Sequence, residues 1–297
     1  MDALTLKPLF MWAGGKNKML KHYKPLMPVS VKSYCEPFFG GGAMFIYVMN
    51  TYAPEYARIN DINPDIVRIY TSIKTNLVDF THRLNALESI YIPMSKEDRK
   101  KYYYEVRHEH AYDYGTWSPA YEAATLYFLM KTGFNGIFQI NQNTNGRYGT
   151  PSGLLNQKDK VYDRDVLSWW HDALQKTDIY CGDWTDAVEN CPKDTFFFFD
   201  PPYRESFADY GNGFGDKQLT DLIEFCDKQS SVMMSNRDDE DWFAKQKHTL
   251  NSANFDIFYT AGRRKKTDEG YDAKKAREIL LYRTTTGLEE FIHERHV

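Results

Sequence analysis

The chain of 297 residues has few cysteines and no long apolar run. Its four cysteines, Cys35, Cys181, Cys191 and Cys226, are scattered and form no CxxC pair, which argues against a disulfide framework. No apolar stretch reaches membrane-spanning length, and the N-terminus lacks the pattern of a signal peptide. We therefore expect a cytoplasmic protein with reduced cysteines.

An excess of positive charge is also missing. The 37 Lys and Arg residues against 41 Asp and Glu give a net charge of −4, so any surface for a polyanion must be local. The longest basic cluster comprises Arg263, Arg264, Lys265 and Lys266, followed by Lys274, Lys275 and Arg277. A single charge run is most often a solvated face.

The composition is that of a folded, soluble chain. Hydrophobic residues make up 42%, aromatic residues 16% and charged residues 26%, which excludes a disordered or membrane protein. The length allows one large domain with an insertion, or two domains.

Short apolar runs that suit buried parallel strands recur along the chain. They are Val31–Cys35, Tyr56–Ile59, Asp178–Cys181, Thr195–Phe199, Ser231–Met234 and Ile279–Tyr282. Helical patterns such as Lys217–Lys228 lie between several of them, and this alternation predicts an open α/β sheet.

The alternation stops between about Asn76 and Lys158. This part is helical in pattern and then becomes the polar stretch INQNTNGRYGTPSG, which is typical of an exposed hairpin or loop. We predict that residues 1–75 and 159–297 form one domain and that 76–158 is an inserted recognition module.

Two glycine clusters are present, and neither is a known phosphate loop. WAGGK lacks the P-loop spacing and by itself suits an ordinary turn. EPFFGGGAMF follows an apolar run directly, so it suits a strand-to-helix turn whose glycines let the backbone approach a ligand. Asp61 lies at the end of the next apolar run. The GxGxxG pattern of dinucleotide sites is absent, so the pair suggests another nucleoside-containing cofactor.

The run FFFFDPPY carries Asp200 to the carboxyl end of a buried strand. Pro201 and Pro202 have no N–H, so the turn offers acceptors only, and Tyr203 adds a flat ring. Two acceptors beside a ring suit the amino group of adenine or cytosine. The ordinary alternative is a solvent-facing turn with a capping aspartate.

WAGGK, EPFFGGG, NDIN, GDW, FFFFDPPY and MMSNRD, in this order, resemble the Dam-like adenine-specific DNA methyltransferases (D12 class, alpha group). The resemblance extends from Leu9 to about Tyr282 and implies a Rossmann-like, S-adenosylmethionine-dependent α/β fold with an inserted, mostly helical DNA-recognition domain. It also implies methyl transfer to the 6-amino group of a flipped adenine in double-stranded DNA, with S-adenosylhomocysteine as product. Because the transfer discharges the positively charged cofactor and depends mainly on positioning, we expect no metal. We also expect a monomer in solution.

The resemblance assigns roles to single residues. The catalytic corner would be Asp200, Pro201 and Tyr203, with Ser235 and Asn236 bordering it. The cofactor-binding residues would be Trp12, Lys16, Phe38, Gly40, Gly42, Asp61, Asp183, Trp184 and Asp200.

The resemblance also places DNA contacts in the insertion, and in a chain of net charge −4 the basic cluster is the candidate for binding the DNA backbone. These residues are Phe134, Asn135, Ile137, Gln139, Arg147, Pro151, Arg263, Arg264, Lys265 and Lys266. Gln139 and Leu154 stand where GATC-specific relatives carry base-reading arginines, so GATC specificity is not carried over.

Other functions fit parts of the pattern. Cytosine, RNA or a protein glutamine amide would also suit an acceptor-only corner. A DNA-binding module with a vestigial pocket is disfavoured by the intact Asp200–Tyr203 corner, and a nucleotide-dependent oxidoreductase is disfavoured by the missing GxGxxG pattern.

Overall fold

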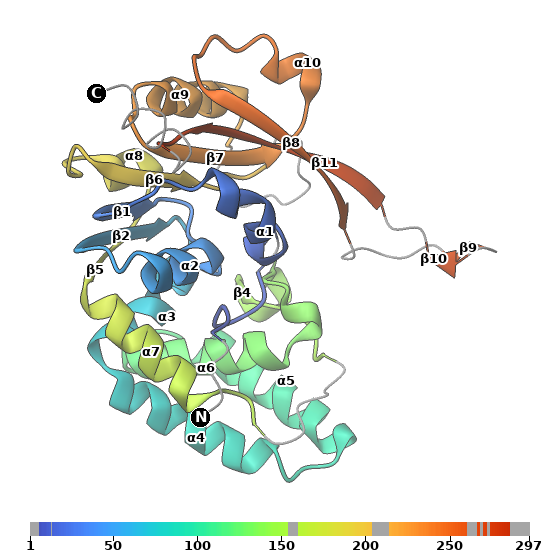
Figure 1. The fold of residues 1–297 in the computed structure, drawn as a ribbon. Coiled ribbons are helices and arrows are strands. Elements are labelled where there is room, and N and C mark those ends of the chain that lie inside the picture. The colour runs from blue at the N-terminus through green and yellow to red at the C-terminus, as the bar shows by residue number, and fades with distance from the viewer. Residues whose placement is uncertain are drawn as a thin grey trace. The chain divides into compact units, whose positions relative to one another are not determined.

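Seven strands form the main sheet, in the order β5-β2-β1-β6-β7-β11-β8. The computed structural model describes residues 6–12, 14–153, 160–203, 214–259, 266–267, 270–271 and 274–285. The chain divides into two units, Met1–Lys18 with Phe39–Glu189 and Met19–Phe38 with Asn190–Val297. Figure 1 labels the elements of both.

The first unit pairs β2 (Tyr56–Asp61) in parallel with β5 (Thr177–Cys181) and carries most of the helices (Figure 1). These are η1 (Lys16–Lys18), α2 (Ala43–Thr51), α3 (Pro64–Thr75), α4 (Leu77–Tyr91), α5 (Lys96–Tyr112), α6 (Pro119–Thr132), η3 (Phe134–Gly136), η4 (Gln142–Thr144), α7 (Arg164–Gln175) and α8 (Trp184–Val188). The apolar helix α6 packs against α3, α4 and α5 and is buried on nearly every side.

Helix starts in this unit follow local sequence signals. The helices from α3 to α8 each begin after a side chain that accepts a backbone N–H: Asn63, Asn76, Ser95, Ser118, Asp163 and Asp183. Such caps satisfy donors that the first helical turn leaves without partners. The strands β3 (Ile140–Asn141) and β4 (Arg147–Tyr148) form a short antiparallel hairpin after α6.

The second unit contains parallel β1 (Ser33–Glu36), β6 (Thr195–Phe199) and β7 (Val232–Arg237). The strand β11 (Lys274–Arg283) runs antiparallel to β7 and to β8 (Asn251–Tyr259). The remaining elements are α1 (Leu20–Tyr23), η2 (Lys24–Leu26), α9 (Asp216–Asp227), α10 (Glu240–Phe243), β9 (Lys266–Thr267) and β10 (Gly270–Tyr271). No helix within the described residues is long and apolar enough to cross a membrane.

The mostly parallel α/β sheet confirms the predicted fold class. All six predicted strands exist, and Thr195–Phe199 is buried at every position, as predicted. Two details are wrong: Ile279–Tyr282 lies in an antiparallel strand, and β5 is an edge strand with mostly exposed residues. Helices α4, α5 and α6 and the β3–β4 hairpin occupy the expected insertion, whose boundaries at 76 and 158 stay a prediction.

Candidate active site

The glycine turn before α2 is shaped by aromatic side chains. Gly40 has a φ of +50°, and a Cβ there would lie 2.6 Å from the Trp12 ring. Gly42 has a φ of +69°, and its Cβ would lie 2.7 Å from Trp170. Left-handed backbone and close rings both require glycine. Backbone conformation and packing therefore explain why glycine occupies both positions. The contact of these glycines with a cofactor stays a prediction.

Asp61, at the end of β2, is tied to this turn. Its Oδ2 accepts from the N–H of Gly40 over 2.8 Å, and its Oδ1 accepts from Asn63 over 2.9 Å. Burial raises the pKa of the Asp61 carboxyl, while these backbone donors lower it. A carboxylate has about four lone-pair sites, so these backbone donors do not use its whole acceptor capacity, and its contact with a ribose stays a prediction.

The end of β5 joins the same region of the first unit. The N–H of Gly182 donates to the carbonyl of Asp61 over 3.3 Å, and Asn60 Nδ2 donates to the carbonyl of Gly182 over 3.1 Å. Asp183 caps α8 by accepting from Thr185 N over 2.9 Å, and Trp184 is 8% exposed. The structure thus brings Gly40, Asp61 and the Asp183 turn together, and their contact with a cofactor stays a prediction.

The N-terminal motif lies on the glycine turn. Trp12 is half-buried, and its ring stands 5.8 Å from the ring of Phe138, which precedes the β3–β4 hairpin. Lys16 is only 3% exposed, and its ammonium donates to the carbonyl of Gly14 over 2.9 Å. A buried ammonium requires such acceptors. The Lys16 side chain is therefore packed within the first unit and is not exposed to solvent.

The predicted catalytic corner lies in the second unit. Asp200 follows the buried strand β6, and its Oδ1 accepts from Ser235 Oγ over 3.0 Å. Ser235 and its neighbour Asn236 are fully buried in β7. Pro201 is buried and Tyr203 is half-buried. The structure therefore brings Asp200 and Ser235 together, and their catalytic role stays a prediction.

Phe38 packs on the strand that carries the corner. Its ring stands 6.3 Å from Phe199 and 5.5 Å from Phe214, both in edge-on geometry. These contacts lie within the second unit, and a role of Phe38 in cofactor binding stays a prediction.

Sequence reasoning missed two residues beside Tyr203. Glu278 of β11 is 3% exposed, and its two carboxylate oxygens accept from the hydroxyls of Tyr203 and Tyr23. Burial and the carboxylates of Glu278 and Asp200 raise the pKa of Tyr23. The signal available in the sequence is a glutamate that opens the apolar run EILLY.

The expected hairpin presents apolar side chains. Phe134 is 41% exposed, Ile137 43% and Ile140 57%. Asn135 has a φ of +52°, and Gln139 is exposed. The turn is fixed by Phe134 N donating to the carbonyl of Pro151 over 2.8 Å and Thr150 Oγ1 donating to Ile137 over 2.6 Å. Their contact with DNA stays a prediction.

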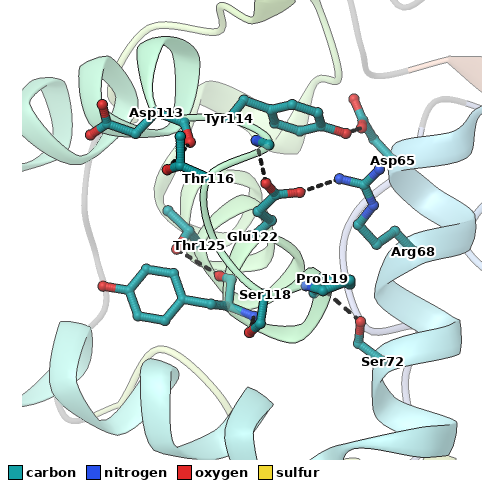
Figure 2. Close-up of polar contacts among 12 residues, drawn as sticks. Asp65, Arg68, Ser72, Asp113, Tyr114, Thr116, Ser118, Pro119, Glu122 and Thr125 are labelled. Atoms are coloured by element: carbon teal, nitrogen blue, oxygen red, sulfur yellow. Dashed lines mark hydrogen bonds and ion pairs between the residues drawn. The ribbon is translucent and has the colours of Figure 1, made fainter.

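Arg147 connects the hairpin to α3. Its guanidinium lies 3.5 Å from the centre of the Tyr114 ring, and the Tyr114 hydroxyl donates to Asp65 over 2.9 Å. Figure 2 shows the neighbouring contacts, in which Glu122 of α6 accepts from Arg68 and from the N–H of Gly115. Arg147 is therefore held by the fold, and its contact with DNA stays a prediction.

Part of the predicted DNA surface is outside the described residues. This holds for Arg263, Arg264, Lys265 and Leu154, and for Lys266 only the backbone in β9 is described. Their predicted roles stay predictions.

Known proteins are similar in sequence to this chain over most of its length. A type II methyltransferase, M.MjaIII of Methanocaldococcus jannaschii, is 30% identical over 257 residues, covering 82% of this chain and 88% of that protein. A type II methyltransferase of Lactococcus lactis, M1.LlaDCHI, is 28% identical over 79% of this chain and 82% of its own. A DNA adenine methylase of Haemophilus influenzae is 27% identical over 79% of this chain and 81% of its own.

The family description of the D12 class N6 adenine-specific DNA methyltransferases matches residues 12–284. This range includes the glycine turn, Asp61, the Asp200 corner and the hairpin. Enzymes of this class use S-adenosylmethionine as methyl donor and DNA as substrate. The chain belongs to the D12 class of N6 adenine-specific DNA methyltransferases, and it is an enzyme.

Proposed function

We propose that the enzyme methylates the 6-amino group of an adenine that has been flipped out of double-stranded DNA. The observation that carries this proposal is the corner in which Ser235 donates to Asp200 Oδ1 and two prolines supply no N–H. One amino hydrogen would be accepted by the Asp200 carboxylate and the other by the carbonyl of Pro201. The amino nitrogen would then direct its lone pair away from the ring plane.

Base flipping is required because the amino group is not reachable inside the stack, and it costs a few kcal/mol. Stacking on Tyr203 would recover part of this cost. The exposed Phe134 and Ile137 would occupy the space that the base leaves, as apolar wedges do in bent or kinked duplexes. Asn135, Gln139, Arg147 and Pro151 would contact the surrounding DNA.

The residues of the first unit fit S-adenosylmethionine. Asp61 retains acceptor capacity for ribose hydroxyls, and Trp12, Lys16, Gly40, Gly42, Asp183 and Trp184 would complete the surroundings. When bound, this cofactor supplies an electrophilic methyl group whose transfer removes the sulfur's positive charge. The carboxylate of Asp200 would favour the charge that develops on the attacking nitrogen. Because positioning is the main requirement, we propose that no metal takes part.

The test is transfer of labelled methyl groups to unmethylated duplex DNA. The wild type should label DNA, and Asp200→Ala should lose nearly all incorporation. Asp221→Ala, which removes an exposed carboxylate paired with Lys217 on α9, should retain it. Absence of labelling by the wild type on any duplex would overturn the proposal.

The names of the relatives favour a place among type II methyltransferases or DNA adenine methylases. We also propose that the enzyme is a monomer and acts in the cytoplasm. We propose further that Arg263, Arg264, Lys265 and Lys266 bind the phosphate backbone of DNA. Removing one cation that neutralises a phosphate should reduce the slope of log affinity against log salt by about 0.9. A variant with all four residues changed to Ala should therefore show a much flatter salt dependence, and an unchanged slope would contradict this assignment.

A further inference from the structure

Glu278 is a buried carboxylate in the middle of β11. It pairs with Arg237 of β7 on one side and with Phe255 of β8 on the other. Its side chain accepts a hydrogen bond from Tyr23 over 3.1 Å and another from Tyr203. Glu278 is 3% exposed, and the following residues Ile279–Leu281 are also buried.

A carboxylate in such surroundings is costly unless hydrogen bonds compensate it. Packing alone would be served as well by an apolar residue. Two tyrosine hydroxyls contribute to this compensation, and the carboxylate thereby fixes where those hydroxyls lie. Hydrogen bonds to an ionised acceptor are also stronger than neutral ones.

The Tyr203 ring is thereby held at both of its ends. Its backbone follows the dihedral-restricted Pro201 and Pro202, and its hydroxyl is held by Glu278. A ring fixed in this way loses little further freedom when a base stacks on it. Preorganisation of this kind lowers the barrier of a step that depends on orientation.

We propose that Glu278 is a positioning residue for methyl transfer: it holds the Tyr203 ring ready to stack on the target base. This inference rests on the proposed function of the Asp200–Tyr203 corner. In this role Glu278 acts through the Tyr203 hydroxyl, to which its carboxylate is hydrogen-bonded.

The test is a double-mutant cycle of Tyr203→Phe and Glu278→Gln, with single-turnover methylation of duplex DNA as the readout. Tyr203→Phe keeps the ring and removes the hydroxyl, whereas Glu278→Gln keeps the shape and removes the charge. Each single variant should lower the methylation rate about 10-fold, the smaller end of what loss of a hydrogen bond to a charged group costs. The double variant should be no slower than the slower single one.

A second readout separates positioning from a merely structural role. The fluorescence of 2-aminopurine at the target position reports an unstacked base, and both variants should alter it while S-adenosylmethionine affinity and melting temperature remain near those of the wild type. The matched control is Tyr56→Phe, which removes a tyrosine–carboxylate hydrogen bond to Asp178 on the surface of the first unit. It should leave both signals unchanged.

Additive rate losses in the double variant would overturn the inference, as would an unchanged rate for Glu278→Gln. If Glu278→Gln lowers the melting temperature strongly, the cycle in the Tyr203→Phe background still decides, because the residual effect of Glu278→Gln there should vanish. An inactive wild type would instead refute the proposed function itself, which keeps the two failures distinct.

Discussion

The hydroxyl of Ser235 donates to Asp200 Oδ1 over 3.0 Å and lies 3.4 Å from the carbonyl of Phe199. Ser235 is fully buried in β7, next to the strand that ends at Asp200. This hydrogen bond fixes the position of Asp200 Oδ1. Because Ser235 belongs to a strand of the sheet, the sheet sets the orientation of the Asp200 carboxylate. The direction of the acceptor therefore depends on a residue outside the DPPY motif.

We expect Ser235→Ala to lower kcat about 10-fold, because a hydrogen bond to a charged group contributes about 1.5–3 kcal/mol. The KM for S-adenosylmethionine should change little, because Ser235 contacts Asp200 of the catalytic corner and belongs to none of the proposed cofactor contacts in the first unit. Steady-state kinetics measure both. Ser89→Ala, at an exposed position of α4, is the control, and a kcat for Ser235→Ala equal to that of the control would refute the role.

Gly40→Ala should weaken S-adenosylmethionine binding and destabilise the protein by about 1–3 kcal/mol. The added Cβ would lie 2.6 Å from the Trp12 ring, in addition to the strain at a φ of +50°. Gly115→Ala gives the control for strain alone, because its φ is +88° and a Cβ there meets no atom within 4 Å. Calorimetry of cofactor binding should separate the two variants, and equal affinities would argue against the assignment of Trp12 and Gly40.

His110 should make the protein less stable in mild acid. Burial lowers the pKa of His110 to about 4, with Arg147 and Arg68 also lowering it and Asp65 raising it. Between pH 6.5 and 4 the unfolded chain therefore takes up a proton that the folded chain does not, so the free energy of unfolding falls as pH falls. The full loss is about 3 kcal/mol.

Urea unfolding at pH 7.5 and pH 4.5 tests this expectation. His110→Leu should lose less stability between the two values than the wild type, since neither ring nitrogen of His110 has a hydrogen-bond partner within the described part of the chain. His82→Leu, at an exposed position of α4, should behave as the wild type does. Parallel pH dependence in wild type and His110→Leu would show that another group is responsible.

Phe134→Ala should lower the rate of DNA methylation about 10-fold, because an exposed aromatic residue on a fixed turn is suited to fill the gap left by a flipped base. Its melting temperature should stay near that of the wild type, since the side chain is 41% exposed. Val78→Ala removes a 78% exposed apolar side chain from α4 and is the matched control. Equal rates for the two variants would remove Phe134 from the DNA surface.

Local patterns predicted much of this fold. Thr195–Phe199 is a continuous apolar run bounded by polar residues, so a fully buried strand was readable. The strand β8 was readable in principle, because Ala253, Phe255 and Ile257 alternate with polar residues, yet Asn and Asp obscure the run. The antiparallel direction of β11 depends on connections along the whole chain and has no local signature.

In the site, too, residues marked by a local sequence pattern were predicted, whereas residues defined by long-range contacts were missed. Asp61 and Asp200 were predicted because each ends an apolar run, where open α/β sheets bind ligands. Glu278 was missed because its partners Tyr23 and Tyr203 are 255 and 75 residues away in sequence. Asp183 illustrates a role that position alone does not reveal, since its carboxylate caps α8.

The most direct test of the central claim is nucleoside analysis of duplex DNA after incubation with the wild-type enzyme and S-adenosylmethionine. Our expectation is that N6-methyldeoxyadenosine is the methylated nucleoside and that it is absent from DNA treated with Asp200→Ala. Methylation confined to the amino group of cytosine, or to RNA offered in the same reaction, would contradict it.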